Sequence, residues 1–153
     1  MAAGAGVALH RGDPGLVVVA LVVQEESVSR RIKVTPLDRK FSKLVRTLAG
    51  WKCERCGKQF VESKASGLEC SHYFGRAIKS TRFCLDNCDS LCTGCHAYFH
   101  SYPHEYYVFK VKKLGDERYA ALVERFNTPV KFNNAFKQDV REWMKLKSEE
   151  IAA

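Results

Sequence analysis

Two pairs of cysteines, each with two residues between its members, are the strongest chemical signal in the sequence. The first pair is Cys53 and Cys56, and the second is Cys92 and Cys95. Two thiolates three positions apart on a tight turn can bind the same tetrahedral ion, and four soft thiolates suit a closed structural zinc site. We therefore predict that these four cysteines bind one structural Zn²⁺.

Two histidines follow directly after the second cysteine pair. His96 and His100 are four positions apart, and a helix that starts near Cys92 would present both imidazoles on one face. Two imidazoles on one face can share a metal ion. We predict a second metal ion here, on a different side of the helix from Cys95. The alternative for His100 is a surface or packing histidine.

A third histidine and an asparagine lie between the two cysteine pairs. His72 follows an apolar segment and precedes a basic loop, and a neutral imidazole can take a proton from water near neutral pH. Asn87 cannot act as a base, but its amide can hold a backbone carbonyl or orient an imidazole. Taken singly, a packed histidine and a turn residue are the simpler readings. The ordered set of His72, Asn87 and His96 between two cysteine pairs favours a catalytic site.

The charge of the chain favours a polyanionic partner, most simply DNA. The 153 residues include 25 Lys and Arg against 17 Asp and Glu, which gives a formal net charge of +8. Several of these cations crowd the loop after His72 or the first cysteine pair, where phosphate is their natural partner. Such contacts position DNA without reading its sequence. The predicted DNA-binding residues are Arg55, Lys58, Arg76, Lys79 and Arg82.

Helices are expected on both sides of the central segment. Thr35 can cap a helix that begins at Pro36, and Gly50 can end it. The other predicted elements are a strand over 67–74, a helix that starts near the second cysteine pair and is interrupted at Pro103, helices over 104–114 and 116–126 separated by Gly115, and a last amphipathic helix that begins at Thr128 and Pro129.

Cysteine number and hydropathy argue against two other classes of protein. Seven cysteines is an odd number and four of them lie in the two pairs, which favours metal binding in a reducing compartment over a secreted disulfide scaffold. We expect Cys70, Cys84 and Cys88 to be small buried hydrophobes. The longest apolar run, 16–23, is far shorter than the roughly twenty residues that span a bilayer. We therefore expect a cytoplasmic protein with no membrane contact and no small-molecule cofactor.

The order and spacing of His72, Asn87 and His96 resemble those of the HNH, or ββα-metal, endonucleases. The resemblance is strongest to phage NinG-like recombination proteins and related prophage HNH proteins, and it covers about residues 33–127. The segments that carry it are WKCERCGK at 51–58, LECSHYFGR at 68–76 and NCDSLCTGCH at 87–96.

This resemblance implies a metal-dependent DNA endonuclease that acts in phage recombination or DNA processing in a bacterial host cell. His72 would be the general base, and Asn87 would hold the loop that orients it. His96, with His100 as second ligand, would bind one catalytic divalent ion such as Mg²⁺ or Mn²⁺. The implied fold is α+β: a small ββα-metal core, similar to a treble clef, held by the four-cysteine zinc site and flanked by helices.

One position departs from the family pattern. Many HNH enzymes have an Asp or His, a further metal ligand, directly before the first histidine, and this chain has Ser71 there. Water or another acid, such as Asp86 or Glu105, would then complete the metal shell. The alternative function is a non-catalytic zinc-held module that binds nucleic acid. The expected organisation is an extension over 1–32, a nuclease domain over 33–127 and a C-terminal helix over 128–153.

Overall fold

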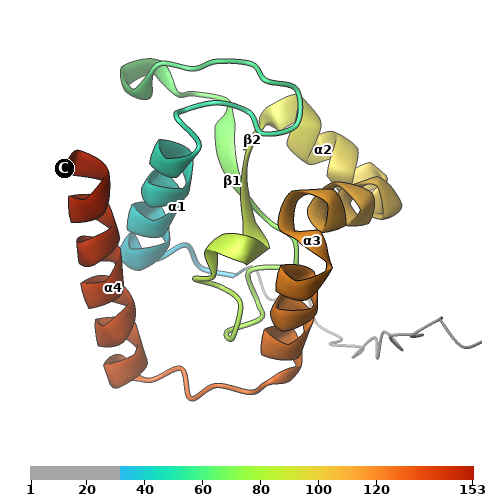
Figure 1. Cartoon of the computed structure of the whole chain (residues 1–153). Coiled ribbons are helices and arrows are strands. Elements are labelled where there is room, and N and C mark those ends of the chain that lie inside the picture. Colours follow the sequence, from blue (N-terminus) through green and yellow to red (C-terminus); the bar gives the residue numbers. More distant parts are fainter. Residues whose placement is uncertain (1–31) are drawn as a thin grey trace, which may run out of the picture. The chain divides into compact units, whose positions relative to one another are not determined.

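A computed structural model describes residues 32–153, so the extension expected over 1–32 lies outside the described residues apart from Ile32 (Figure 1). The described residues all belong to one compact unit. In the described part, four α-helices pack with a two-stranded antiparallel sheet, which confirms the α+β prediction. The elements in order are α1 (Pro36–Leu48), η1 (Glu62–Lys64), β1 (Leu68–His72), η2 (Leu85–Asn87), β2 (Cys88–Cys92), α2 (Thr93–Ser101), α3 (Pro103–Asn127) and α4 (Asn134–Ala152).

Helix α1 starts where its sequence signals predict. The Thr35 hydroxyl accepts a hydrogen bond from the Asp38 backbone N–H at 3.2 Å, and the Asp38 carboxylate accepts one from the Thr35 N–H at 2.7 Å. This reciprocal pair is a capping box, which satisfies amide groups that the first turn leaves without partners. No helix in the described residues is long and apolar enough to cross a membrane.

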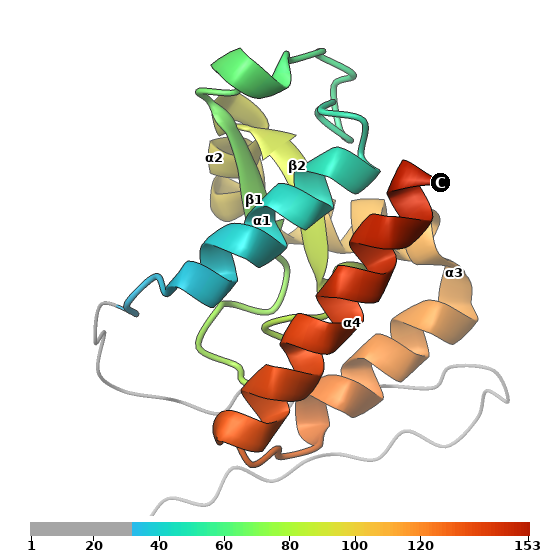
Figure 2. The ribbon, with the colours of Figure 1, turned by 90° about the vertical axis from the view of Figure 1, so that its left-hand side faces the viewer.

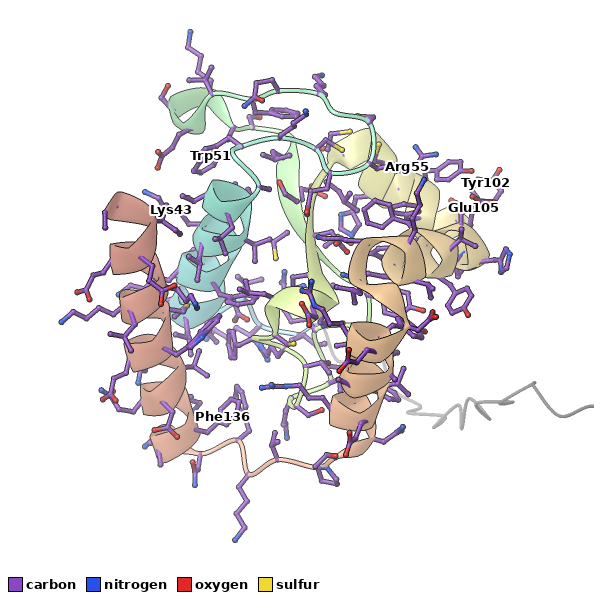
Figure 3. The ribbon with its side chains drawn as sticks, viewed as in Figure 1. Lys43, Trp51, Arg55, Tyr102, Glu105 and Phe136 are labelled. Carbon is purple, nitrogen blue, oxygen red and sulfur yellow. The ribbon has the colours of Figure 1, made fainter. Side chains whose placement is uncertain are left out.

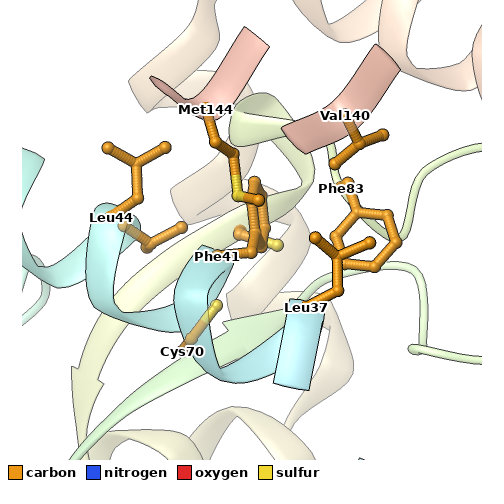
Figure 4. Close-up of a cluster of buried hydrophobic side chains, with 9 residues drawn as sticks. Leu37, Phe41, Leu44, Cys70, Phe83, Val140 and Met144 are labelled. Atoms are coloured by element: carbon orange, nitrogen blue, oxygen red, sulfur yellow. The ribbon is translucent and has the colours of Figure 1, made fainter. Parts of the chain in front are cut away.

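The main hydrophobic core lies between α1, α4 and one face of the sheet (Figures 2 and 4). Phe41 is at its centre, with only 1% of its surface exposed, and its ring meets that of Phe83 edge-on at 5.5 Å. Val140 and Met144 approach from α4. Because α4 contributes to this core, it forms part of the same folded unit as the sheet.

The predicted helix break at Gly115 is present, whereas the last helix starts later than predicted. Gly115 has a φ of 74° and interrupts α3, as predicted. The chain resumes a helix directly after it. The predicted start at Thr128 and Pro129 is wrong, because α4 begins only at Asn134. The side chain of Asn133 caps α4 by accepting from the Phe136 N–H at 2.9 Å, whereas Thr128 ends α3.

The sheet pairs Ser71 with Asp89 and His72 with Cys88. Side chains alternate between the two faces of a strand, so His72 and Cys88 share the face that also carries Cys70. Ser71 and Asp89 share the opposite face. Helix α1 covers the face that carries Cys70 and Cys88. Helix α3 covers the opposite face, where Tyr106 and Lys110 contact Asp89.

A buried charge network joins β2 to α3 and to the first cysteine turn. Asp89 and Lys110 are both fully buried, and their charged groups lie 2.8 Å apart. Asp89 also accepts a hydrogen bond from the Tyr106 hydroxyl at 2.7 Å and forms an ion pair with Lys113 at 2.7 Å. Lys113 forms a second ion pair, with Glu54, at 2.6 Å. Such a cluster is stable only while every buried charge keeps its partner.

We expect Asp89→Asn to lower the free energy of unfolding by about 3–5 kcal/mol, because the buried ammonium of Lys110 loses its counter-charge. Denaturant unfolding of both proteins measures the difference. Arg118→Gln is the control, because it breaks a more exposed pair with Asp86 and costs less than about 1 kcal/mol. Equal effects of the two changes would contradict the central place given to Asp89.

Candidate functional site

The four cysteines of the two sequence pairs converge on one point. Their sulfur atoms all lie within 4.8 Å of one another, and those of Cys56 and Cys92 are 3.8 Å apart. A tetrahedral ion with bonds of about 2.3 Å to sulfur separates its ligands by about 3.8 Å. All seven cysteines carry free thiols. The cluster could therefore hold a metal ion.

Backbone and side-chain donors surround these sulfurs. Burial raises the pKa of Cys53, but the backbone N–H groups of Cys56, Cys92 and Arg55 outweigh burial and lower the pKa from 9.0 to about 7. The Arg55 guanidinium also donates to the Cys95 sulfur at 3.5 Å and lies 3.8 Å from the centre of the Tyr98 ring, beside α2 (Figure 3). Burial outweighs the Arg55 contact at Cys95, whose pKa is raised from 9.0 to about 12. The donors therefore favour the thiolate of Cys53, which is the form that binds metal.

Asn87 holds the loop that follows His72. Its side chain is fully buried and makes three hydrogen bonds to backbone groups. The amide oxygen accepts from the Phe74 N–H at 2.7 Å, and the amide nitrogen donates to the carbonyls of Phe74 at 2.9 Å and Thr81 at 3.1 Å. Both ends of the loop over 74–81 are therefore fixed by one side chain.

His72 has a defined tautomer. Its Nε2 atom lies 3.1 Å from the backbone carbonyl oxygen of Arg82. A carbonyl oxygen can only accept, so Nε2 carries the proton and the lone pair is on Nδ1. Burial, and then the positive charge of Arg76, lower the pKa of His72 from 6.5 to about 4. The imidazole is therefore neutral at neutral pH, with a basic nitrogen at Nδ1.

A cleft of about 310 Å³ brings the three predicted histidines together. Its lining includes His72, His96 and His100, together with Ser71 and Tyr106. His96 and His100 come from α2, where their spacing of four places them on one face, as predicted. Among the described residues, however, neither of these two belongs to a cluster of three metal-ligating side chains.

Glu69 is a site residue that the sequence analysis missed. Its carboxylate lies 2.5 Å from Nδ1 of His96, so that nitrogen donates and the lone pair of Nε2 is left for other ligands. Glu69 lies two residues before Ser71 on the same face of β1. Only the pairing of β1 with the segment leading into α2 reveals this contact, which is why sequence spacing gave no signal for it.

The acids expected to replace a ligand at position 71 are placed differently. Ser71 is buried, and its hydroxyl lies 3.1 Å from that of Tyr106, to which it donates because the Tyr106 proton goes to Asp89. Asp86 forms an ion pair with Arg118, and Glu105 is exposed in the first turn of α3 (Figure 3). Glu69 is therefore the acid in contact with a cleft histidine.

Arg82 corrects one of the predicted phosphate contacts. It is 8% exposed, and its guanidinium makes a two-pronged ion pair with Asp38, with distances of 2.8 and 2.7 Å. A guanidinium held in this way inside the protein cannot bind DNA, so that prediction for Arg82 is wrong. Its side chain instead ties the loop after His72 to the start of α1.

DNA binding by the other basic residues stays a prediction. Arg76 lies in the loop after His72, is half-buried, and its Nε atom has no hydrogen-bond partner among the described residues. Lys79 and Lys58 are exposed. Arg55 is exposed as well, although its guanidinium already contacts the cysteine cluster.

A family model described as the bacteriophage lambda NinG protein matches residues 30–152. That is most of the chain. The protein belongs to the NinG family. No curated protein and no solved structure matches it. Membership in this phage family supports a role related to phage recombination.

We expect Cys53→Ser to remove the metal ion from this NinG-family protein and to lower its free energy of unfolding by about 3 kcal/mol or more, because metal-binding energy contributes to folding. Elemental analysis and thermal unfolding measure the two effects. Cys84→Ser is the matched control, since Cys84 lies outside the four-cysteine cluster. Unchanged metal content in Cys53→Ser would contradict the assignment.

The Asp38–Arg82 pair predicts a pH dependence of stability. Burial raises the pKa of Asp38, but hydrogen bonds from Arg82 and Thr35 outweigh it and lower the pKa from 3.8 to about 2. A carboxyl group with a lowered folded-state pKa stabilises the fold above its unfolded pKa and loses that contribution as the pH falls through the folded one. The contribution is about 2 kcal/mol at neutral pH.

We therefore expect the stability gap between the wild type and Asp38→Asn to narrow by about 2 kcal/mol between pH 6 and pH 2. Denaturant unfolding at several pH values measures the gap. A gap that stays constant over this range would show that the Asp38 carboxylate is not stabilised by its partners.

Proposed function

We propose that this NinG-family protein is a metal-dependent DNA endonuclease of the HNH type, acting in phage recombination or DNA processing. The observation that carries the proposal is a neutral His72 with its lone pair on Nδ1, in the same cleft as His96 and His100. The order β1, β2, α2 is the order that a ββα-metal unit requires. Asn87, which holds the loop after β1, supports the same reading.

In this proposal His72 is the general base. Its Nδ1 takes a proton from the water that attacks the phosphorus atom, while the Nε2–H bond to Arg82 keeps the ring in place. The water oxygen bonds to phosphorus as the P–O3′ bond breaks, and the leaving O3′ takes a proton from solvent water, which gives a 5′-phosphate and a 3′-hydroxyl. A divalent ion such as Mn²⁺ or Mg²⁺, when bound by His96 and His100, neutralises phosphate charge and stabilises the leaving oxygen.

Glu69 takes the role of a positioning residue for His96. Histidines that bind metal generally donate their second ring N–H to a carboxylate, which fixes the tautomer and makes the other nitrogen a better ligand. The contact between Glu69 and Nδ1 of His96 has this form. Since Ser71 offers no carboxylate, His96 and His100 would be the protein ligands of the ion, and water and DNA phosphate would have to supply the others.

Charge and the cysteine cluster support DNA as the substrate and zinc as the structural ion. The chain carries a formal net charge of +8. Arg76 and Lys79 lie on the loop beside His72, and neither forms an ion pair in the part of the chain that the structure describes. We assign them to phosphate contacts next to the scissile bond. Four cysteine sulfurs within 4.8 Å of one another suit Zn²⁺, which binds four ligands in a tetrahedron.

The second candidate is a non-catalytic zinc-held module that binds nucleic acid. Two observations favour it. Ser71 is buried against Tyr106 where related enzymes have a metal ligand, and neither His96 nor His100 belongs to a cluster of three metal-ligating side chains among the described residues. In this alternative the cleft histidines contact DNA without cutting it.

Cleavage of plasmid and branched DNA, with Mg²⁺, Mn²⁺ or no added divalent ion, tests the nuclease. We expect His72→Ala to lower cleavage by about 100-fold or more, because a general base is lost, with the structural Zn²⁺ content and DNA binding unchanged. His104→Ala is the matched control, since His104 is exposed at the start of α3. Equal cutting by the wild type and His72→Ala would reject His72 as the base. DNA binding without any cutting by the wild type would favour the module.

A further inference from the structure

We propose that Cys70, His72 and Cys88 form a second binding site, for a thiophilic divalent ion such as Zn²⁺ or Cd²⁺, and that its occupation switches off the nuclease by taking up His72. The existence of the site is independent of the nuclease. Only its inhibitory effect rests on the proposed function.

The three side chains lie together because of the register of the sheet. His72 pairs with Cys88 across the two strands, and Cys70 lies two residues before His72 on the same face. The two sulfur atoms and a ring nitrogen of His72 all lie within 4.8 Å of one another. This cluster shares no residue with the four-cysteine cluster. Cys70 is 7% exposed and Cys88 is 2% exposed.

The donor set selects the chemistry of the ion. Two thiolates and one imidazole are soft ligands, which favour Zn²⁺ and Cd²⁺ over Mg²⁺. Bonds of about 2.0–2.3 Å in tetrahedral geometry bring ligand atoms to about 3.5–3.8 Å, so the cluster needs to close by only about 1 Å. Two thiolates cancel the charge of a divalent ion, which suits a buried position. Three protein ligands leave one position for water.

Register argues against a disulfide as the reason for this cluster. Cys70 pairs with Ser90 and Cys88 with His72, so the two cysteines are diagonal neighbours rather than direct partners. Diagonal positions in an antiparallel pair are about 7–8 Å apart, while a disulfide needs Cα atoms within about 6.8 Å. The sulfurs can share an ion without the backbone shift that a disulfide would require.

Binding of a metal ion at this site prevents His72 from acting as a base, whichever of its two ring nitrogens binds the ion. If Nδ1 binds the ion, its lone pair is used directly. If Nε2 binds, it must give up the proton that it donates to Arg82, and a neutral imidazole then carries that proton on Nδ1. In both cases Nδ1 can no longer accept a proton from water. The same side chain therefore cannot serve the ion and the reaction together.

Metal titration of the full chain tests the site directly. Protein that already contains one Zn²⁺ per chain is titrated with Cd²⁺, and the absorption of cadmium–thiolate bonds and the bound metal are measured. We expect one further equivalent of thiolate-bound Cd²⁺ in the wild type and in Cys84→Ser, the control. We expect it to be absent in both Cys70→Ala and Cys88→Ser, two separate variants that guard against a folding defect in either. Thiolate-bound Cd²⁺ that persists as a second equivalent in both Cys70→Ala and Cys88→Ser would contradict the proposed site.

Cleavage in Mg²⁺ with added Zn²⁺ tests the inhibition. We expect the second equivalent to stop cutting by the wild type, and the inhibitory Zn²⁺ concentration to rise at least about ten-fold in Cys70→Ala and Cys88→Ser. Unchanged inhibition in both variants would place the inhibitory ion at His96 and His100 and overturn the proposal. A second equivalent bound by a protein that never cuts DNA would retain the site and reject the nuclease. A protein that cuts DNA but binds no second thiolate-bound equivalent would retain the nuclease and reject the site.

Discussion

The buried carboxylate of Asp89 is the constraint on which the arrangement of the site depends. It lies on β2, and Lys110, Lys113 and Tyr106 of α3 together offset the cost of burying it. A slip of the hairpin by one residue would turn Asp89 to the opposite face and leave Lys110 buried without a counter-charge. The charge network therefore fixes the register that brings His72 to the end of β1, next to Cys88.

The two faces of this small sheet hold different chemistry. The face toward α1 carries Cys70, Cys88 and the ring of His72, whereas the other carries Ser71 and Glu69, with Glu69 in contact with His96. The candidate cleft opens where β1 ends and both groups come within reach. In the proposed mechanism, an end position of this kind allows His72 from one face and His96 from α2 to act on one phosphate, provided that the loop after His72 is fixed. Asn87 meets that condition.

Local signals in the sequence predicted the structure well, and pairings between distant residues were missed. The Thr35 cap, the break at Gly115 and the convergence of the two cysteine pairs depend on neighbours in the chain or on spacing typical of metal ligands. The role of Arg82 depends on Asp38, which is 44 positions away, and that of Glu69 on His96, which is 27 positions away. Thr128 and Pro129 imitate a helix start, but the chain needs several more residues before α4 can begin.

The Asp38–Arg82 pair connects the stability of the fold to the chemistry of His72. Asp38 caps α1 and holds the Arg82 guanidinium, and the backbone carbonyl of Arg82 accepts the Nε2 proton of His72. In a buried imidazole, the hydrogen bond that one ring nitrogen makes decides which of the two nitrogens carries the proton. An ion pair at the start of α1 therefore helps to decide which nitrogen of His72 is basic. The residue expected to bind DNA phosphate instead orients the group proposed to activate water.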